Sequence, residues 1–204
     1  PWRTSWLSRE GVAAVACLGF AAMLAFAALL DLHPVILRIL AVPVLLLAIA
    51  TVWCTGMIYE SLPTVRAWSH WLTTEIYLML AVTSGALLKT TLLALFGAFS
   101  DGTTWTVVLL LAVAAVMKLV YWRGIDRTPR ILTAGTATGL GSIGHVRSLE
   151  SPHTQANFIM REMGYQVARK HADSLRMMTM VLTFGLPAAL LALAELVLPS
   201  LKPL

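Results

Sequence analysis

Five long apolar segments constrain the fold of this chain more than any other feature. They comprise residues 11–30, 39–59, 72–97, 104–122 and 177–198. An α-helix needs about 20 predominantly apolar residues to cross the hydrocarbon core of a bilayer, and each segment is close to that length. Only 12% of the 204 residues are charged, against about 25% in soluble domains. We therefore predict an all-α fold, a polytopic transmembrane helix bundle with five spans.

The linkers between the first four segments are short. They are residues 31–38, 60–71 and 98–103. Short connections favour antiparallel neighbours in a helix bundle, so residues 1–122 are predicted to form a four-span transmembrane bundle. Residues 177–204 then supply the last span and a short tail.

Residues 123–176 differ in composition from the spans on either side. They contain eight of the fifteen Lys and Arg residues, which predicts a basic extramembrane loop. From Phe158 to Arg176, apolar and basic side chains recur on different faces of a helical pattern. We expect an amphipathic helix there, either lying at the membrane surface or packed beneath a partner subunit.

The basic residues also predict an orientation in the membrane. Eleven of them fall on one side of the membrane, in residues 1–10, 60–71 and 123–176. The opposite side holds only Arg38 and Lys202. The positive-inside rule makes the basic side cytoplasmic, unless those charges serve a soluble partner that docks there. In either case the net charge of +5 reflects topology, and no nucleic-acid partner is expected.

The histidines and cysteines argue against a metal or a haem in this part of the protein. All five histidines lie outside the interiors of the spans, whereas a haem between membrane helices needs axial ligands, usually histidines, within them. Cys17 and Cys54 are the only cysteines, and an iron–sulfur cluster normally takes four. We therefore predict no metal site and no haem.

The pattern Trp-Leu-(Ser/Thr)-x-Glu occurs twice, each time at the start of a long apolar segment. The copies are Trp6-Leu7-Ser8-Arg9-Glu10 and Trp71-Leu72-Thr73-Thr74-Glu75. A tryptophan suits the membrane interface, and Ser8 or Thr73 is a suitable N-cap that would place the glutamate in the first helical turn. The repeat has two interpretations: a shared way of starting a helix, or a carboxylate in a bundle cleft that accepts a proton from a bound hydroxyl.

The second copy lies in a richer polar and aromatic setting. His70 and Glu75 are candidates for a proton-accepting pair, with Trp68 and Trp71 as apolar walls, and a solvated interfacial histidine is the alternative. Lys89 lies deep in the same segment and shares a helix face with Glu75. A charge at that depth marks either a polar pathway or a side chain that snorkels to the interface.

Four stretches resemble the membrane anchor subunit of dimethyl sulfoxide (DMSO) reductase, the DmsC family. They are Arg3–Glu10, Leu62–Trp68, Tyr121–Asp126 and Pro152–Val167, and the resemblance covers essentially the whole chain. It implies a haem-free, multi-pass protein of the bacterial inner membrane that binds and oxidises menaquinol. Electrons would pass to an iron–sulfur subunit and then to a molybdopterin catalytic subunit. The anchor is then the quinol-oxidising subunit, not the catalytic subunit, of an oxidoreductase complex.

The resemblance also implies a quinol site. In the family this site is associated with a histidine at the end of one helix and a glutamate at the start of the next. The glutamate matches Glu10, and the histidine would precede Pro1, where about two more spans are expected. Glu10 would then accept a hydroxyl proton, with Arg9 stabilising the transient anion and Trp6 and Ser8 lining the pocket.

Two other functions remain open from the residues themselves. A transporter or proton-pathway subunit would account for the apparent repeat and for Lys89 and Glu195. A purely structural anchor would bind no quinone at all. If the second copy of the motif is itself functional, His70, Trp71 and Glu75 are site residues. On the resemblance, Glu75 is only a structural counterpart of Glu10.

Overall fold

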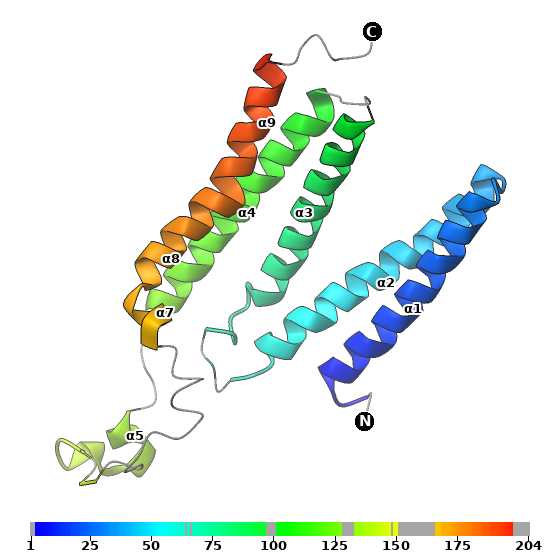
Figure 1. The fold of residues 1–204 in the computed structure, drawn as a ribbon. Helices are drawn as coiled ribbons and strands as arrows, with labels where there is room; N and C mark the ends of the chain where they lie inside the picture. The colour runs from blue at the N-terminus through cyan, green and yellow to red at the C-terminus, as the bar shows by residue number, and fades with distance from the viewer. Residues whose placement is uncertain are drawn as a thin grey trace. The chain divides into compact units, whose positions relative to one another are not determined.

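The chain is helical in a computed structural model, which describes residues 3–63, 65, 67–96, 101–127, 133–147, 149–150 and 166–197. No strand occurs in these residues. The long helices are α1 (Trp6–Leu29), α2 (Pro34–Glu60), α3 (Thr73–Leu95), α4 (Asp101–Arg127), and a last helix formed by α8 (Ala172–Thr179), a π-helical segment (Met180–Gly185) and α9 (Leu186–Val197). Figure 1 shows these elements. Five helices of the described chain are long and apolar enough to cross a membrane, which confirms the predicted all-α bundle of five spans.

Helix α1 begins earlier in the sequence than its apolar segment indicates. Ser5, in extended conformation, is the N-cap, and its side chain accepts a hydrogen bond from the Ser8 backbone N–H at 3.4 Å. Ser8 is therefore not the cap, and Glu10 lies in the second turn of α1. The favourable effect of a helix dipole on a carboxylate is largest within the first turn, so it is weaker at Glu10 than the sequence predicted.

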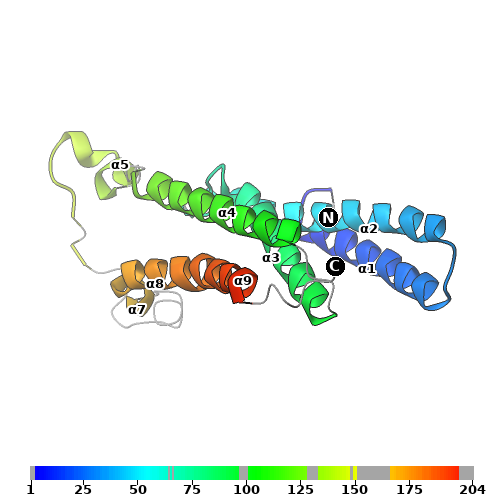
Figure 2. The ribbon, with the colours of Figure 1, turned by 90° about the horizontal axis from the view of Figure 1, so that it is seen from above.

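Helices α1 and α2 pack along each other as an antiparallel pair (Figures 1 and 2). The turn between them contains Asp31 with a φ of 49°, a left-handed conformation that Asp tolerates better than most residues. His33 is the N-cap of α2, and Pro34 occupies the first turn, where its missing N–H costs nothing. The helix continues through Pro43.

Helices α2 and α3 approach closely at Gly56. A Cβ atom built on Gly56 would lie 2.8 Å from the Cα of Thr74, so only glycine fits at this point. Leu72 is the N-cap of α3 but supplies no side-chain hydrogen bond. Thr73 is the first helical residue and not the N-cap, and its hydroxyl instead donates to the Trp68 carbonyl at 2.6 Å.

The described residues divide into two compact units. The first holds α1 to α4 as far as Ile125, together with α9 from Ala188 onward. The second, Asp126–Pro187, contains the short helices α5 (Ala134–Thr138) and α7 (Gln166–Lys170). Within it Arg176 forms a two-pronged ion pair with Asp126, at 2.8 and 2.9 Å.

The expected amphipathic helix is described only in part. Its first residues, 158–165, lie outside the described residues. Residues 166–170 are helical as α7, and His171 separates them from α8. The last apolar helix begins at Ala172, so Arg176 belongs to that helix and not to a separate surface helix.

Candidate functional site

A hydrogen bond between α1 and α2 marks the candidate site. The Thr55 hydroxyl on α2 donates to Glu10 Oε1 on α1 at 2.6 Å. Both side chains are half-buried. The hydrogen bond therefore fixes one carboxylate oxygen of Glu10 between two apolar helices, and Oε2 accepts no hydrogen bond in the described part of the chain.

Two other predicted site residues lie beside Glu10. The Arg9 guanidinium stacks over the Trp6 ring at 4.3 Å from its centroid and donates a hydrogen bond to the Arg3 carbonyl. Arg9 and Glu10 follow Trp6 by three and four residues, which places all three on one side of the helix. That side of the start of α1 therefore presents an aromatic ring, a cation and a carboxylate.

Ser8 occupies a different position from these three. It contributes its backbone N–H to the N-cap bond with Ser5. Because it lies two residues from both Trp6 and Glu10, its side chain leaves the helix on another side. The structure thus places Ser8 next to the site in sequence but not on the same face.

The second copy of the motif has a different arrangement. Glu75 lies in the first turn of α3, and its Oε2 is buried without a hydrogen-bond partner among the described residues. His70 Nδ1 accepts a hydrogen bond from the Leu72 N–H at 3.2 Å. The His70 ring packs edge-on against Tyr121, with centroids 5.2 Å apart, and no hydrogen bond joins it to Glu75 in the part of the chain that the structure describes.

The two tryptophans expected beside His70 separate. Trp71 stacks on His70, with ring centroids 6.0 Å apart. Trp68 instead packs edge-on against Tyr59 at 5.2 Å, and Tyr59 stacks on Tyr77 at 5.8 Å. These contacts form an aromatic cluster of Tyr59, Trp68 and Tyr77 where α2 ends and α3 begins, so Trp68 packs on tyrosine rings.

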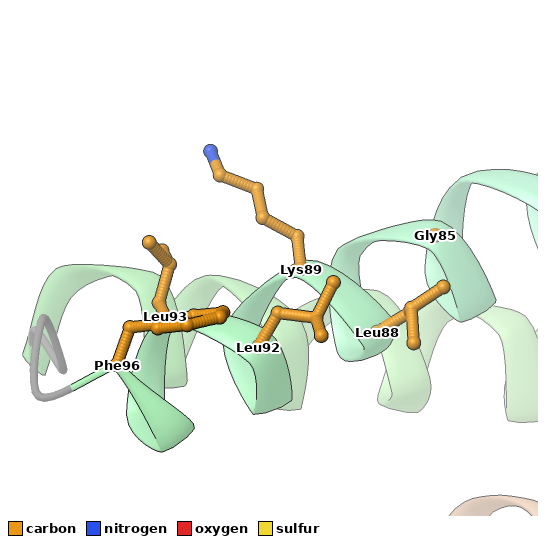
Figure 3. A pocket seen from close by; sticks show the side chains of 6 residues that line it. All are labelled: Gly85, Leu88, Lys89, Leu92, Leu93 and Phe96. Atoms are coloured by element: carbon orange, nitrogen blue, oxygen red, sulfur yellow. The ribbon is translucent and has the colours of Figure 1, made fainter.

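Lys89 lies on an exposed part of α3. It borders an open apolar depression whose other lining residues are Gly85, Leu88, Leu92, Leu93 and Phe96. Figure 3 shows its side chain extended toward the end of the helix at which Leu93 and Phe96 lie. A lysine that carries its ammonium group toward the nearer helix end has the geometry of snorkelling.

Two residues of the site region were not predicted from the sequence. Thr55 holds Glu10, and Glu60, the last residue of α2, accepts hydrogen bonds from Thr74 in α3. The one signal for Glu60 was its position, a carboxylate directly after a span and shortly before the start of another. Among the described residues, no group of three or more His, Cys, Asp or Glu is placed to hold a metal ion.

Comparisons with known proteins agree with the resemblance noted in the sequence. The family model of the DMSO reductase anchor subunit (DmsC) matches residues 2–198. A sulfite dehydrogenase subunit of Allochromatium vinosum is 29% identical over 216 residues, covering 100% of this chain and 66% of the relative. The chain thus spans just under two thirds of the length of that relative. No solved structure matches.

Proposed function

The chain belongs to the family of DMSO reductase anchor subunits, and from that premise we propose that it oxidises menaquinol for a molybdenum enzyme. In this proposal it anchors an iron–sulfur subunit and a molybdopterin catalytic subunit to the bacterial inner membrane. The five apolar helices make it a multi-pass membrane protein. The substrate, the partners and the direction of electron flow are parts of the proposal.

The observation that carries the proposal is the placement of Glu10 between α1 and α2. Oxidation of a quinol to a quinone releases two protons and two electrons. A carboxylate at a helix interface can accept a hydroxyl proton as a general base, and Oε2 of Glu10 accepts no hydrogen bond in the described residues. The other oxygen is held by Thr55 at 2.6 Å, which keeps the acceptor oriented.

Arg9 and Trp6 complete the proposed site. A quinol that loses one proton carries a negative charge, which a nearby guanidinium stabilises. Arg9 is held over the Trp6 ring. Because Trp6 precedes Glu10 by four residues, the Arg9 charge stays on the same side of α1 as the carboxylate. The two electrons leave to the iron–sulfur subunit, and the second proton leaves to water at the membrane surface.

Substitution of Glu10 in the whole complex tests the proposal. Glu10→Gln removes the base and keeps the shape, so quinol-dependent turnover is expected to be lost. Membrane attachment of the catalytic subunit, and turnover driven by a soluble dye that reduces that subunit directly, should persist. Glu150→Gln, an exposed carboxylate, is the matched control. Normal quinol-dependent turnover in Glu10→Gln would contradict the proposal.

A second candidate function reverses the direction of electron flow. The relative in Allochromatium vinosum is named as a subunit of a sulfite dehydrogenase, an enzyme that removes electrons from its substrate. A chain in such a complex would reduce a quinone, and Glu10 would then donate a proton instead of accepting one. Assays of the purified complex with quinol plus an S-oxide, and with quinone plus sulfite, distinguish the two directions.

The same purification separates the remaining alternatives. Co-purifying molybdopterin and iron–sulfur subunits support the proposed anchor, and bound quinone separates it from a purely structural anchor. A transporter or proton-pathway subunit would purify without these partners.

A further inference from the structure

Thr55 has one hydroxyl proton and two acceptors within reach. Its Oγ1 lies 2.6 Å from Glu10 Oε1 and 2.9 Å from the Thr51 carbonyl oxygen one turn earlier in α2. A hydroxyl donates one hydrogen bond and can accept others through its lone pairs. The two contacts therefore cannot both be donated by Thr55 at the same time.

The two contacts allow the Thr55 hydroxyl to serve both protonation states of Glu10. When Glu10 is ionised, its oxygen only accepts, so Thr55 donates to it. When the proton enters on Oε2, as in the proposed function, Oε1 becomes the carbonyl oxygen of the acid and still accepts from Thr55. If the proton moves to Oε1, that O–H donates to Thr55 Oγ1, and the Thr55 proton can turn to the Thr51 carbonyl. A carbonyl that already accepts a helical hydrogen bond has a second lone pair for this. Oε1 of Glu10 and the Thr55 hydroxyl therefore keep a hydrogen-bond partner in either state.

We propose that Thr55 is a positioning residue for Glu10 that supplies a hydrogen-bond partner to its ionised and protonated forms alike. The inference rests on the proposed function, in which Glu10 changes protonation state during each turnover. In an apolar helix interface, a polar group that loses its partner costs about 1–3 kcal/mol. Thr55 removes that cost from the proton transfer and keeps the carboxylate in one place before and after it.

Helix α2 also contains a matched control for this role. Thr51 is a threonine one turn earlier, and its hydroxyl donates to the Leu47 carbonyl at 2.8 Å. It therefore makes the same bond to its own helix as Thr55, but its hydroxyl makes no hydrogen bond to a carboxylate among the described residues. Replacing either threonine by valine keeps the shape and removes one hydroxyl, so a difference between the two variants reports the bond to Glu10.

The experiment compares Thr55→Val, Thr55→Ser and Thr51→Val in the whole complex. Loss of a hydrogen bond to a charged group should lower quinol-dependent kcat in Thr55→Val by about ten- to hundredfold. Thr55→Ser keeps the hydroxyl and should restore turnover to within about tenfold of the original, and Thr51→Val should lie in that range as well. Dye-driven turnover should be unchanged in all three.

Infrared difference spectroscopy reports the hydrogen bonding of the Glu10 carboxyl group. A purely structural role of Thr55 would leave that signal unchanged. The carboxyl C=O band of protonated Glu10 is assigned by its loss in Glu10→Gln. In Thr55→Val this band should move to higher wavenumber, because the carboxyl group loses its hydrogen bond. It should stay in place in Thr55→Ser and Thr51→Val.

The outcomes separate the two proposals. If Glu10→Gln turns over normally, the proposed function fails. If Glu10→Gln is inactive but Thr55→Val has normal turnover and an unmoved band, only the role of Thr55 fails. Equal losses in Thr55→Val and Thr51→Val would also overturn that role. If Thr55→Val does not assemble, Thr55→Ala is judged by the same criteria.

Discussion

Glu60 holds Thr74 with two hydrogen bonds across the junction of α2 and α3. Its Oε2 accepts from the Thr74 backbone N–H at 3.1 Å and from the Thr74 hydroxyl at 2.5 Å. Leu72, the N-cap of α3, makes no side-chain hydrogen bond, so Glu60 satisfies a free N–H of the first turn in its place. A carboxylate at the N-terminus of α3 is also favoured by the dipole of that helix.

Removing the Glu60 carboxylate should weaken the junction of α2 and α3. Loss of an N-cap hydrogen bond costs about 0.5–2 kcal/mol, and we expect Glu60→Ala to destabilise the purified protein by an amount in that range. Glu60→Gln keeps one oxygen acceptor and should lose less. The measurement is unfolding in a denaturing-detergent titration, with exposed Glu150→Ala as the control. Equal stability of Glu60→Ala and Glu150→Ala would show that another group caps α3.

Replacing Gly56 or Gly19 by alanine should change the free energy of unfolding in opposite directions. A Cβ on Gly56 would lie 2.8 Å from the Thr74 Cα, which is backbone and cannot turn aside, so Gly56→Ala should cost about 1–3 kcal/mol of stability. Gly19 has nothing within 4 Å of such a Cβ, and alanine there should gain up to about 1 kcal/mol from its better helix propensity. Both variants are compared in the same detergent titration. A loss of stability in Gly19→Ala as large as in Gly56→Ala would contradict the close approach.

Gly124 and His70 should show energetic coupling. A Cβ on Gly124 would lie 2.5 Å from His70 Nε2, so Gly124→Ala must displace the imidazole from its contact with Tyr121. In a His70→Ala background that obstacle is gone, and the penalty of Gly124→Ala should disappear. Residues in contact commonly show coupling energies of about 0.5–3 kcal/mol.

A double-mutant cycle measures this coupling as the difference between the two penalties. Gly85→Ala, at a helical position with nothing within 4 Å of the new Cβ, is the control and should behave alike in both backgrounds. An unchanged penalty for Gly124→Ala after removal of His70 would refute the contact.

Substitution of Lys89 should distinguish its two interpretations. A snorkelling lysine contributes a solvated charge, so Lys89→Met should keep quinol-dependent turnover and change stability by no more than about 0.5 kcal/mol. Lys89→Arg keeps the charge and is the matched variant. Loss of turnover in Lys89→Met with full activity in Lys89→Arg would favour the polar-pathway interpretation instead.

The sequence was sufficient for the spans because each depends only on the length of a local apolar segment. Glu10 and Glu75 became candidates for a similar reason, as carboxylates at the start of such segments. The family resemblance favoured Glu10, and its role stays a prediction. The N-cap of α1 was misplaced because Ser5 and Ser8 both carry hydroxyl groups. They stand three residues apart, which is the spacing that joins a cap to the N–H that it accepts, and the upstream serine takes the role.

The hydrogen-bond partners of Glu10 and Thr74 could not be predicted from the apolar pattern of the sequence. Thr55 is 45 residues from Glu10, and Glu60 is 14 residues from Thr74. These contacts depend on how each helix is rotated about its axis, and α2 is apolar on all sides, so its sequence carries no stripe that marks the direction of a neighbour. The aromatic cluster around Tyr59 was missed for the same reason.

Thr55 and Gly56 are adjacent in α2, yet the first contacts α1 and the second contacts α3. Successive residues of an α-helix point about 100° apart, so these two positions define the azimuth of α2 from both sides. A turn of α2 that lengthened the bond to Glu10 would also press its backbone against Thr74 or separate the two. One rotation of α2 therefore sets both the hydrogen bond to the Glu10 carboxylate and the backbone contact with Thr74, and neither can change without the other.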